Sequence, residues 1–135
     1  MSVPSECPVE MRVIVCGTRE RCNDVWIWRK LDEIHGERKF THFMQGGAGG
    51  VDLAAKEWAR KTPGLERFEC KADWDKFGNA AGPIRNARMM EWKPDLVLAF
   101  PGPKSVGTYD MIEKARASGV ETIVFLISSN EGEGS

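Results

Sequence analysis

The tightest constraint on how this chain folds is a run of four glycines within five positions, Gly46, Gly47, Gly49 and Gly50. They follow an apolar segment at residues 40–45, and a helix is predicted to begin at Val51 or Asp52. Glycine lets a backbone turn tightly and lets a ligand approach it closely. The next helix points its unpaired N–H groups and its positive dipole end at the loop, which suits a phosphate. A tight turn with no ligand fits the same residues, because the loop lacks the Walker Lys-Ser/Thr ending and the dinucleotide glycine spacing.

Apolar runs alternate with amphipathic runs along the whole chain. Strands are predicted at 11–16, 40–45, 65–71, 95–100 and 121–127, the third of them at a sheet edge because it is less apolar. Helices are predicted from Asn23 or Asp24 to a stop at residues 35–36, from 51 or 52 to a stop at 62–64, at 83–92 and at 108–118, with a loop at 72–82. This alternation predicts an α/β domain at 11–127 with a mostly parallel sheet of about five strands. Residues 1–10 are predicted to be a flexible arm, and 128–135 a disordered tail.

Composition excludes several function classes. A chain of 135 residues suits one domain, and its net charge of -1 gives no overall basic field, which argues against a nucleic-acid partner. No apolar run approaches the length of a membrane span and residues 1–10 lack a signal pattern, so a cytoplasmic protein without a membrane partner is expected. His35 and His42 have no third ligand at a useful spacing, so no metal site is predicted from them, and a Mg²⁺ cofactor stays open.

Three glycine-bearing turns are predicted to meet at one edge of the sheet. They are Gly17-Thr18-Arg19, the glycine run with Ala48, and residues 101–107, which include Pro101, Gly102, Gly107 and Thr108. Each follows a strand, and ligands of parallel sheets bind at the carboxyl ends of the strands. The convergence predicts a phosphate or nucleotide site.

Several side chains near these turns carry two interpretations each. Arg85 offers a planar fork for a phosphate and Asn86 an amide for a ribose or base, or else Arg85 pairs with Asp73 or Asp110 to hold a loop. Thr108 is a phosphate donor or a helix cap. Trp74 stacks on a base or covers the core.

Two acids are the candidates for chemistry. Asp52 at the start of a helix stabilises the helix dipole, or it grips a ribose hydroxyl, a metal ion or Arg85. Asp110 has the same ambiguity. In a reaction both would serve as general acid or base, or would stabilise an oxocarbenium-like centre.

Four segments together resemble the YspA-like, cpYpsA-related family of small bacterial and phage proteins. They are residues 45–52 (QGGAGGVD), 72–74 (ADW), 81–86 (AGPIRN), and 100–102 followed by 107–111 (FPG and GTYDM). The resemblance covers about 11–127 and implies the Rossmann-like three-layer fold of the SLOG superfamily. It also implies a nucleotide or nucleotide-derived ligand, an ADP-ribose derivative among the candidates.

The superfamily includes the LOG phosphoribohydrolases, whose Pro-Gly-Gly-x-Gly-Thr-x-x-Glu signature ends in a catalytic Glu. Here Met111 falls at the position of that Glu, and Asp110, one residue earlier, is rotated by about 100° on a helix. This departure argues against LOG-type hydrolysis. These residues fit two functions. One is a sensor or sequestering protein for a nucleotide-derived molecule, and the other is a hydrolase of an N-glycosidic or phosphate bond that uses Asp52 and Asp110 with Arg85. A homodimer is plausible for a domain of this size.

Overall fold

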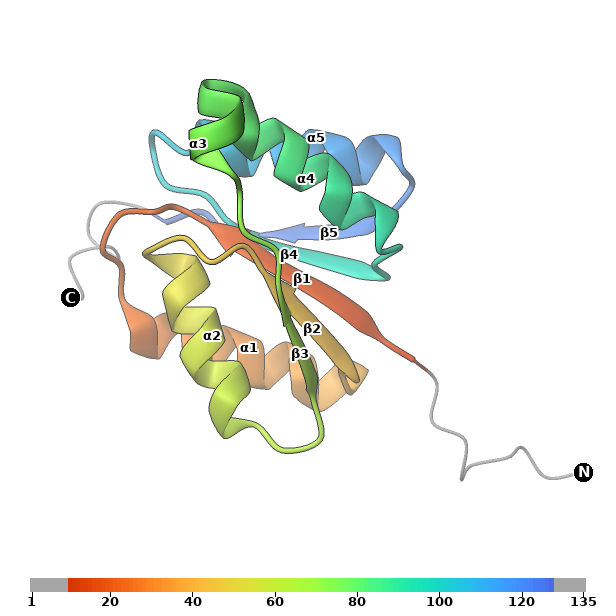
Figure 1. Cartoon of the computed structure of the whole chain (residues 1–135). Coiled ribbons are helices and arrows are strands. Elements are labelled where there is room, and N and C mark those ends of the chain that lie inside the picture. Colours follow the sequence, from red (N-terminus) through yellow and green to blue (C-terminus); the bar gives the residue numbers. More distant parts are fainter. Residues whose placement is uncertain (1–9, 128–135) are drawn as a thin grey trace, which may run out of the picture.

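Five short segments form one parallel sheet in the computed structural model, which describes residues 10–127 (Figure 1). The strands are β1(Arg12–Gly17), β2(His42–Gln45), β3(Glu66–Glu69), β4(Leu96–Phe100) and β5(Glu121–Val124). Their order is β3-β2-β1-β4-β5, and every neighbouring pair is parallel. The predicted α/β class is confirmed, and so is the edge position of the third strand. The order reverses direction between β1 and β4, which makes their carboxyl ends the expected place for a ligand crevice.

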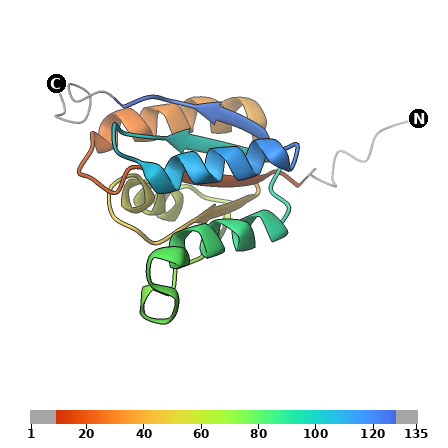
Figure 2. The same ribbon diagram turned by 90° about the horizontal axis from the view of Figure 1, so that it is seen from above.

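Helices cover both faces of the sheet. They are α1(Asp24–Arg38), α2(Val51–Lys61), α3(Trp74–Phe77), a 3₁₀ turn η1(Gly78–Ala80), α4(Ala81–Glu91) and α5(Val106–Ala117). Figure 1 places α1 and α2 on one face and α4 and α5 on the other, which gives the three layers of a Rossmann-like fold; Figure 2 shows the same arrangement from above. Within residues 10–127, no helix is long and apolar enough to cross a membrane.

The alternation of side chains along β1 divides the core into two halves. Val13 and Val15 pack in the half under α1 and α2, while Ile14 packs in the half under α4 and α5. All three side chains are fully buried. Successive residues of a strand point to opposite faces, so a strand covered on both sides must be apolar at each position. The nearly continuous apolar run of β1 is explained by this double burial.

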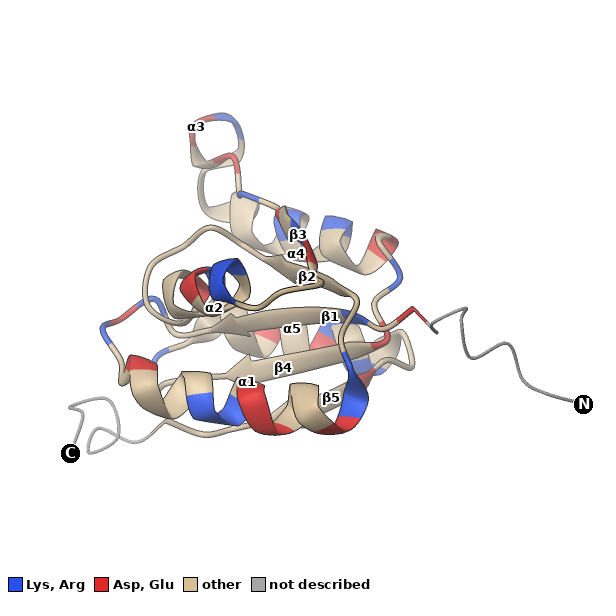
Figure 3. Cartoon of the chain, turned by 90° about the horizontal axis from the view of Figure 1, so that it is seen from below, with Lys and Arg blue, Asp and Glu red and all other residues tan. Residues whose placement is uncertain are grey.

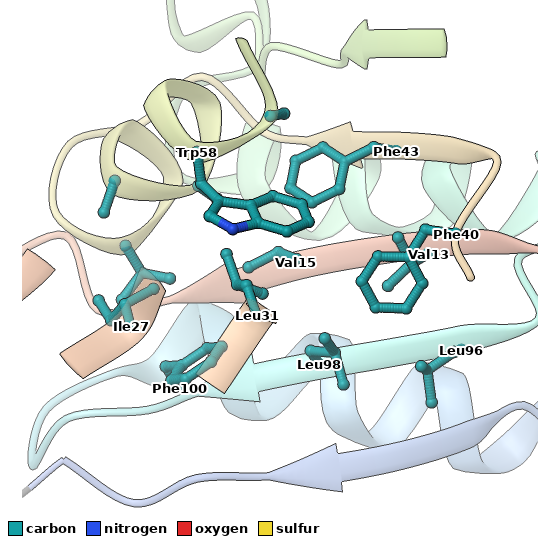
Figure 4. Close-up of a cluster of buried hydrophobic side chains, with 14 of the residues drawn as sticks. Val13, Val15, Ile27, Leu31, Phe40, Phe43, Trp58, Leu96, Leu98 and Phe100 are labelled. Carbon is teal, nitrogen blue, oxygen red and sulfur yellow. The ribbon is translucent and has the colours of Figure 1, made fainter. Parts of the chain in front are cut away.

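Aromatic rings fill the larger half of the core (Figure 4). The Trp58 ring lies 5.6 Å from the Phe43 ring, and its Nε1 donates a hydrogen bond to Asp32 Oδ1 at 2.8 Å. Trp28 Nε1 donates to the carbonyl oxygen of Ala54 at 2.8 Å. Both indoles therefore join α1 to α2, Trp58 as a buried ring and Trp28 as a partly buried one, each with a satisfied N–H group.

The predicted end of the first helix at residues 35–36 is wrong. Gly36 lies inside α1, which continues to Arg38. A Cβ at Gly36 would meet nothing within 4 Å, so the position does not require glycine. The stop is Lys39, with a left-handed φ of 57°, whose N–H donates to the carbonyl oxygen of His35 at 2.8 Å. His35 Nδ1 also accepts from the Phe40 N–H at 3.0 Å. These contacts at the helix end outweigh the preference of glycine for that position.

The loop predicted at residues 72–82 is also wrong in part. It contains α3 and η1, because Asp73 Oδ1 accepts from the Lys76 N–H at 3.1 Å and so caps a short helix. The next helix, predicted to begin at Pro83, begins two residues earlier at Ala81. Pro83 still lies in its first turn, where a missing N–H is tolerated. The predicted arm, apart from Glu10, and the predicted tail lie outside the described residues.

Charged residues lie mainly on the helices and loops. Figure 3 shows acidic and basic residues mixed along α1, while β4 in the middle of the sheet carries none.

Candidate functional site

A cavity of about 620 Å³ lies at the carboxyl ends of β1, β2 and β4, where the strand order reverses. Cavities of this size hold small-molecule ligands. Of the residues predicted to bind a ligand, the following line it: Gly17, Thr18, Arg19, Gly46, Ala48, Asp52, Trp74, Arg85, Asn86, Gly107, Thr108 and Asp110. The structure thus brings together residues from all three predicted turns and from the two segments between them.

Five residues predicted to bind a ligand are not part of this lining, namely Gly47, Gly49, Gly50, Pro101 and Gly102. Gly50 has a φ of +60°, and a Cβ there would lie 2.3 Å from the Thr18 carbonyl oxygen. A Cβ on Gly102 would lie 3.2 Å from Thr18 Cβ. Gly50 therefore lets two backbone segments pack closely, and Gly102 leaves room for the Thr18 side chain.

The first turn is held between β4 and α2. The Thr18 N–H donates to the Phe100 carbonyl oxygen at 3.0 Å, and the Thr18 carbonyl accepts from the Val51 N–H at 3.0 Å. A Cβ on Gly17 would lie 2.5 Å from Val51 Cγ2 and 2.6 Å from the Phe100 carbonyl oxygen. The turn after β1 therefore requires glycine for packing, whatever the cavity binds.

The amides of the glycine loop are largely used inside the protein. The Gly47 N–H donates to Gln45 Oε1 at 2.6 Å, and the Ala48 N–H donates to Asp52 Oδ2 at 3.2 Å. With the Val51 N–H also taken, three donors that were expected to face a phosphate already have acceptors. The loop shapes the floor of the cavity more than it offers donors to it.

Asp52 lies on the first turn of α2 with only 5% of its surface exposed. Burial raises the pKa of its carboxyl group to about 6, although the N–H groups of Ala48 and Gly46 and the positive charges of Arg85 and Arg19 act in the opposite direction. Its Oδ1 atom is buried and has no hydrogen-bond partner among the described residues. A buried carboxylate oxygen without a donor is unusual, and this one belongs to a residue that lines a cavity.

Arg85 is held by neutral acceptors on three segments. Its Nη1 donates to the carbonyl oxygen of Gly46 at 2.9 Å and is 3.4 Å from that of Cys70, and its Nε donates to Asn86 Oδ1 at 3.0 Å. No ion pair with Asp73 or Asp110, the two partners considered from the sequence, occurs in the region that the structure describes. The guanidinium instead ties α4 to the glycine loop, with its side chain bordering the cavity.

Asn86 and Asp110 form a second fixed network. Asn86 Nδ2 donates to the Gly107 carbonyl oxygen at 3.1 Å and to Asp110 Oδ2 at 3.0 Å, while Lys114 Nζ donates to Asp110 Oδ1 at 2.7 Å. Burial alone would raise the pKa of Asp110, but the hydrogen bonds from Lys114 and Asn86 hold it below its usual value. Both Asp110 oxygens thus have donors, in contrast to those of Asp52.

The N-terminus of α5 presents unused donors to the cavity. No acceptor for the N–H groups of Gly107 and Thr108 is found between residues 10 and 127, and the Thr108 hydroxyl is likewise without a hydrogen bond there. Ser105 Oγ accepts from the Gly102 N–H at 2.7 Å, and Lys104 also lines the cavity. Two free amides, a hydroxyl and an ammonium group at the positive end of a 12-residue helix suit an anion.

A short flap, formed by α3 and η1 at residues 74–80, carries the aromatic residue of the site. Trp74 on α3 is 43% exposed, and the Arg19 guanidinium carbon lies 4.4 Å from the centre of its ring. A Cβ on Gly82 would be 3.4 Å from Trp74 Cη2. The indole therefore borders the cavity as a flat, partly exposed surface rather than as part of the core.

The chemistry of the lining is mixed in charge. Arg19, Arg85 and Lys104 are basic, and Glu20, Asp52 and Asp110 are acidic, so three charges of each sign border the cavity. No group of three His, Cys, Asp or Glu side chains suited to a metal ion occurs in the described part of the chain.

Nine lining residues were not predicted from the sequence: Cys16, Glu20, Asn79, Gly82, Pro83, Met89, Lys104, Ser105 and Val106. Lys104 and Ser105 lie in the predicted third turn, and a serine just before a helix is a usual capping position, so both had a signal. Cys16 had no such signal, because a cysteine in an apolar strand usually packs as a small hydrophobic residue. It does pack against the core from β1, and burial raises the pKa of its thiol.

Comparison with known proteins relates the chain to a protein family and to a phage protein. The sequence profile of the YAcAr family, described as the YspA, cpYpsA-related SLOG family, matches residues 11–77, which span β1 through α3 and include the glycine loop. The Gene 61 protein of Mycobacterium phage D29 is 35% identical to the chain, over 84% of this chain and 95% of the phage protein.

Proposed function

The chain belongs to the YspA, cpYpsA-related SLOG family, and on that basis we propose that it binds a nucleotide or nucleotide-derived small molecule as a sensor or a sequestering protein. An ADP-ribose derivative is among the candidate ligands. The family suggests nucleotide-related binding or processing in general. The observation that carries the narrower proposal is the 620 Å³ cavity bordered by the unused donors of α5.

The phosphate is assigned to the N-terminus of α5. The N–H groups of Gly107 and Thr108 have no acceptors in the described part of the chain, and Lys104 adds a positive charge beside them. The glycine loop is the weaker candidate, because its amides already serve Gln45 and Asp52, and the Asp52 carboxylate would repel a second anion. This assignment leaves Arg19 and Trp74 for the rest of the ligand.

The base is assigned to the flap. Trp74 has a flat ring, the residue is 43% exposed, and the Arg19 guanidinium lies over the ring with its carbon 4.4 Å from the ring centre. Base–aromatic stacking is tolerant of base identity, so it supports a nucleotide without naming the base.

A hydrolase remains the second candidate, and Asp52 is the observation that favours it. Its pKa of about 6 is near the value that suits a general acid or base at neutral pH. Asp110 supports the idea less, since Lys114 and Asn86 occupy its oxygens. In this alternative Asp52 acts on an N-glycosidic or phosphate bond, with Arg85 holding the loop beside it.

The test is a thermal-shift panel of nucleoside monophosphates, cyclic dinucleotides, NAD and ADP-ribose, followed by chromatography of each stabilising compound after incubation. Binding to the native state raises the melting temperature according to concentration and affinity. A compound recovered intact supports a sensor or sequestering protein. A compound recovered cleaved supports the hydrolase, and the products identify the bond.

If no compound stabilises the protein at large excess, the proposed function is wrong. If a compound is cleaved, Asp52→Asn and Asp110→Asn separate the two acids. The Asp52 variant is expected to lose turnover, and the Asp110 variant to keep part of it.

A further inference from the structure

One polar atom on the cavity floor is left without a partner. Asp52 is 5% exposed, its Oδ2 accepts from the Ala48 N–H at 3.2 Å, and its Oδ1 has no hydrogen bond within residues 10–127. The residue borders the cavity. Burying a carboxylate oxygen without a donor lowers stability, so a donor supplied by a ligand would remove a penalty that the empty site carries.

The surrounding side chains do not supply that donor. The Gly46 N–H is close enough to the carboxyl group to lower its pKa, but Oδ1 has no hydrogen-bond partner within residues 10–127. Arg85 is the nearest basic side chain from α4, but its Nη1 and Nε atoms donate to Gly46, Cys70 and Asn86. A Cβ on Gly46 would lie 2.2 Å from Arg85 Nη1 and 2.9 Å from Asp52 Oδ2, so only glycine leaves both side chains in place. Glycine at position 46 therefore keeps the Asp52 carboxylate in place, with its Oδ1 atom still without a donor.

The chemistry of an acceptor limits what can lie opposite it. A carboxylate oxygen repels a phosphate and binds a hydroxyl or amino group. We infer that the site takes ribonucleotides in preference to deoxyribonucleotides, with Asp52 Oδ1 accepting a hydrogen bond from a ribose hydroxyl. This inference rests on the proposed nucleotide-binding function and specifies the sugar.

An exocyclic amino group of a base is the competing donor. The depth of the two subsites argues for the sugar, because the flat surface for a base is Trp74, which is 43% exposed, whereas Asp52 is 5% exposed on the floor. A base stacked on Trp74 and a phosphate at α5 leave the connecting sugar to face the floor. A ribose hydroxyl and a base amino group can each be absent from a ligand independently of the other, so binding measurements distinguish them.

The experiment is isothermal titration of the full chain with AMP, GMP, CMP, UMP and ADP-ribose, each beside its 2′-deoxy and 3′-deoxy forms. For the compounds that bind, at least one deoxy form is expected to bind about tenfold or more weakly, the usual effect of losing a hydrogen bond to a charged group. Deoxy forms that bind within twofold of their parents overturn the inference and leave the proposed function standing. A preference that follows the amino group, with CMP bound and UMP not, also overturns it. If none of the five compounds binds, the inference is overturned, and the wider panel with cyclic dinucleotides and NAD decides the proposed function separately.

Variants assign the preference to one residue. Asp52→Ala is expected to abolish the ribose-to-deoxyribose preference, and Asp52→Asn to reduce it, because an amide oxygen is a weaker acceptor than a carboxylate. Asp24→Asn is the matched comparison: like Asp52 it is an acid in the first turn of a helix, but it lies outside the cavity lining, so the preference stays. If Asp52→Ala does not fold, Asp52→Asn decides alone, and an unchanged preference in it overturns the assignment.

Discussion

Arg85 Nη1 donates a hydrogen bond to the carbonyl oxygen of Gly46 at 2.9 Å, joining α4 to the glycine loop across 39 positions of the sequence. The same atom is 3.4 Å from the Cys70 carbonyl, and Nε donates to Asn86 Oδ1. One guanidinium therefore connects the end of β2, the segment after β3 and the first turns of α4. A planar group with five donors can do this, and an ammonium group cannot match its geometry.

Arg85→Lys is predicted to lower the free energy of unfolding by about 1–3 kcal/mol, because carbonyl groups that Arg85 satisfied lose their donor. Urea denaturation followed by circular dichroism measures the change. Arg88→Lys serves as the comparison, since Arg88 is exposed on the same helix. It is expected to shift stability by less than about 0.5 kcal/mol. Equal effects in the two variants would show that the bridge does not stabilise the fold.

Two glycine substitutions are predicted to have opposite effects. Gly50→Ala places a Cβ 2.3 Å from the Thr18 carbonyl oxygen at a φ of +60°, so it is expected to destabilise the protein by more than about 2 kcal/mol. Gly36→Ala lies inside α1 with no atom within 4 Å of the new Cβ, and it is expected to stabilise by about 0.5–1 kcal/mol. Melting temperatures of the two variants test this. A neutral Gly50→Ala would mean that the glycine loop rearranges easily.

The fold could be predicted from the sequence because the strand periodicity and the turn residues indicate the same element boundaries. The apolar run of β1 marked a strand buried on both faces, and the glycines after β1 and β2 marked turns at one sheet edge. Local hydrogen bonds decided what the pattern left open. Lys39 adopts a left-handed conformation beyond Gly36, and Asp73 caps a helix where a loop was predicted.

The candidate site was predictable in its location and less so in its internal bonding. The glycine turns, the segment with Arg85 and Asn86, and the predicted residues Asp52, Trp74 and Asp110 together account for 12 of the 21 lining residues. The sequence did not say that Asp52 accepts the Ala48 N–H, or that Lys114 neutralises Asp110 from one helical turn away. Such pairings depend on which side chains meet in space, and a spacing pattern alone does not determine that.

The stability contributed by Asp52 is predicted to change with pH in a definite direction. Its folded pKa of about 6 lies above the usual aspartate value of 3.8, so between these pH values the folded state holds a proton that the unfolded chain releases. The ionised carboxylate therefore destabilises the fold, fully above about pH 6 and less as pH falls toward 4. Arg85, Arg19 and Cys16 are the titratable or charged groups that interact with it.

Asp52→Asn, which cannot ionise, is then expected to be more stable than the parent at pH 7.5 by about 2 kcal/mol, with the difference disappearing near pH 4. Thermal denaturation of both proteins from pH 4 to pH 8 measures this. A constant difference across that range would mean that the carboxyl group is not titrating between folded and unfolded states.

Lys104→Ala is predicted to weaken the binding of phosphate-bearing nucleotides about fivefold, because an ammonium group beside the N-terminus of α5 is lost. Arg116→Ala removes the same charge from the last turn of that helix, away from the cavity lining, and is expected to leave affinity nearly unchanged. Titration of AMP and of adenosine at two salt concentrations separates the contributions. The Lys104 effect should shrink at high salt, since exposed charges are screened, and it should be absent for adenosine, which has no phosphate. If adenosine were weakened as much as AMP, Lys104 would contact the nucleoside and the phosphate would lie elsewhere in the cavity.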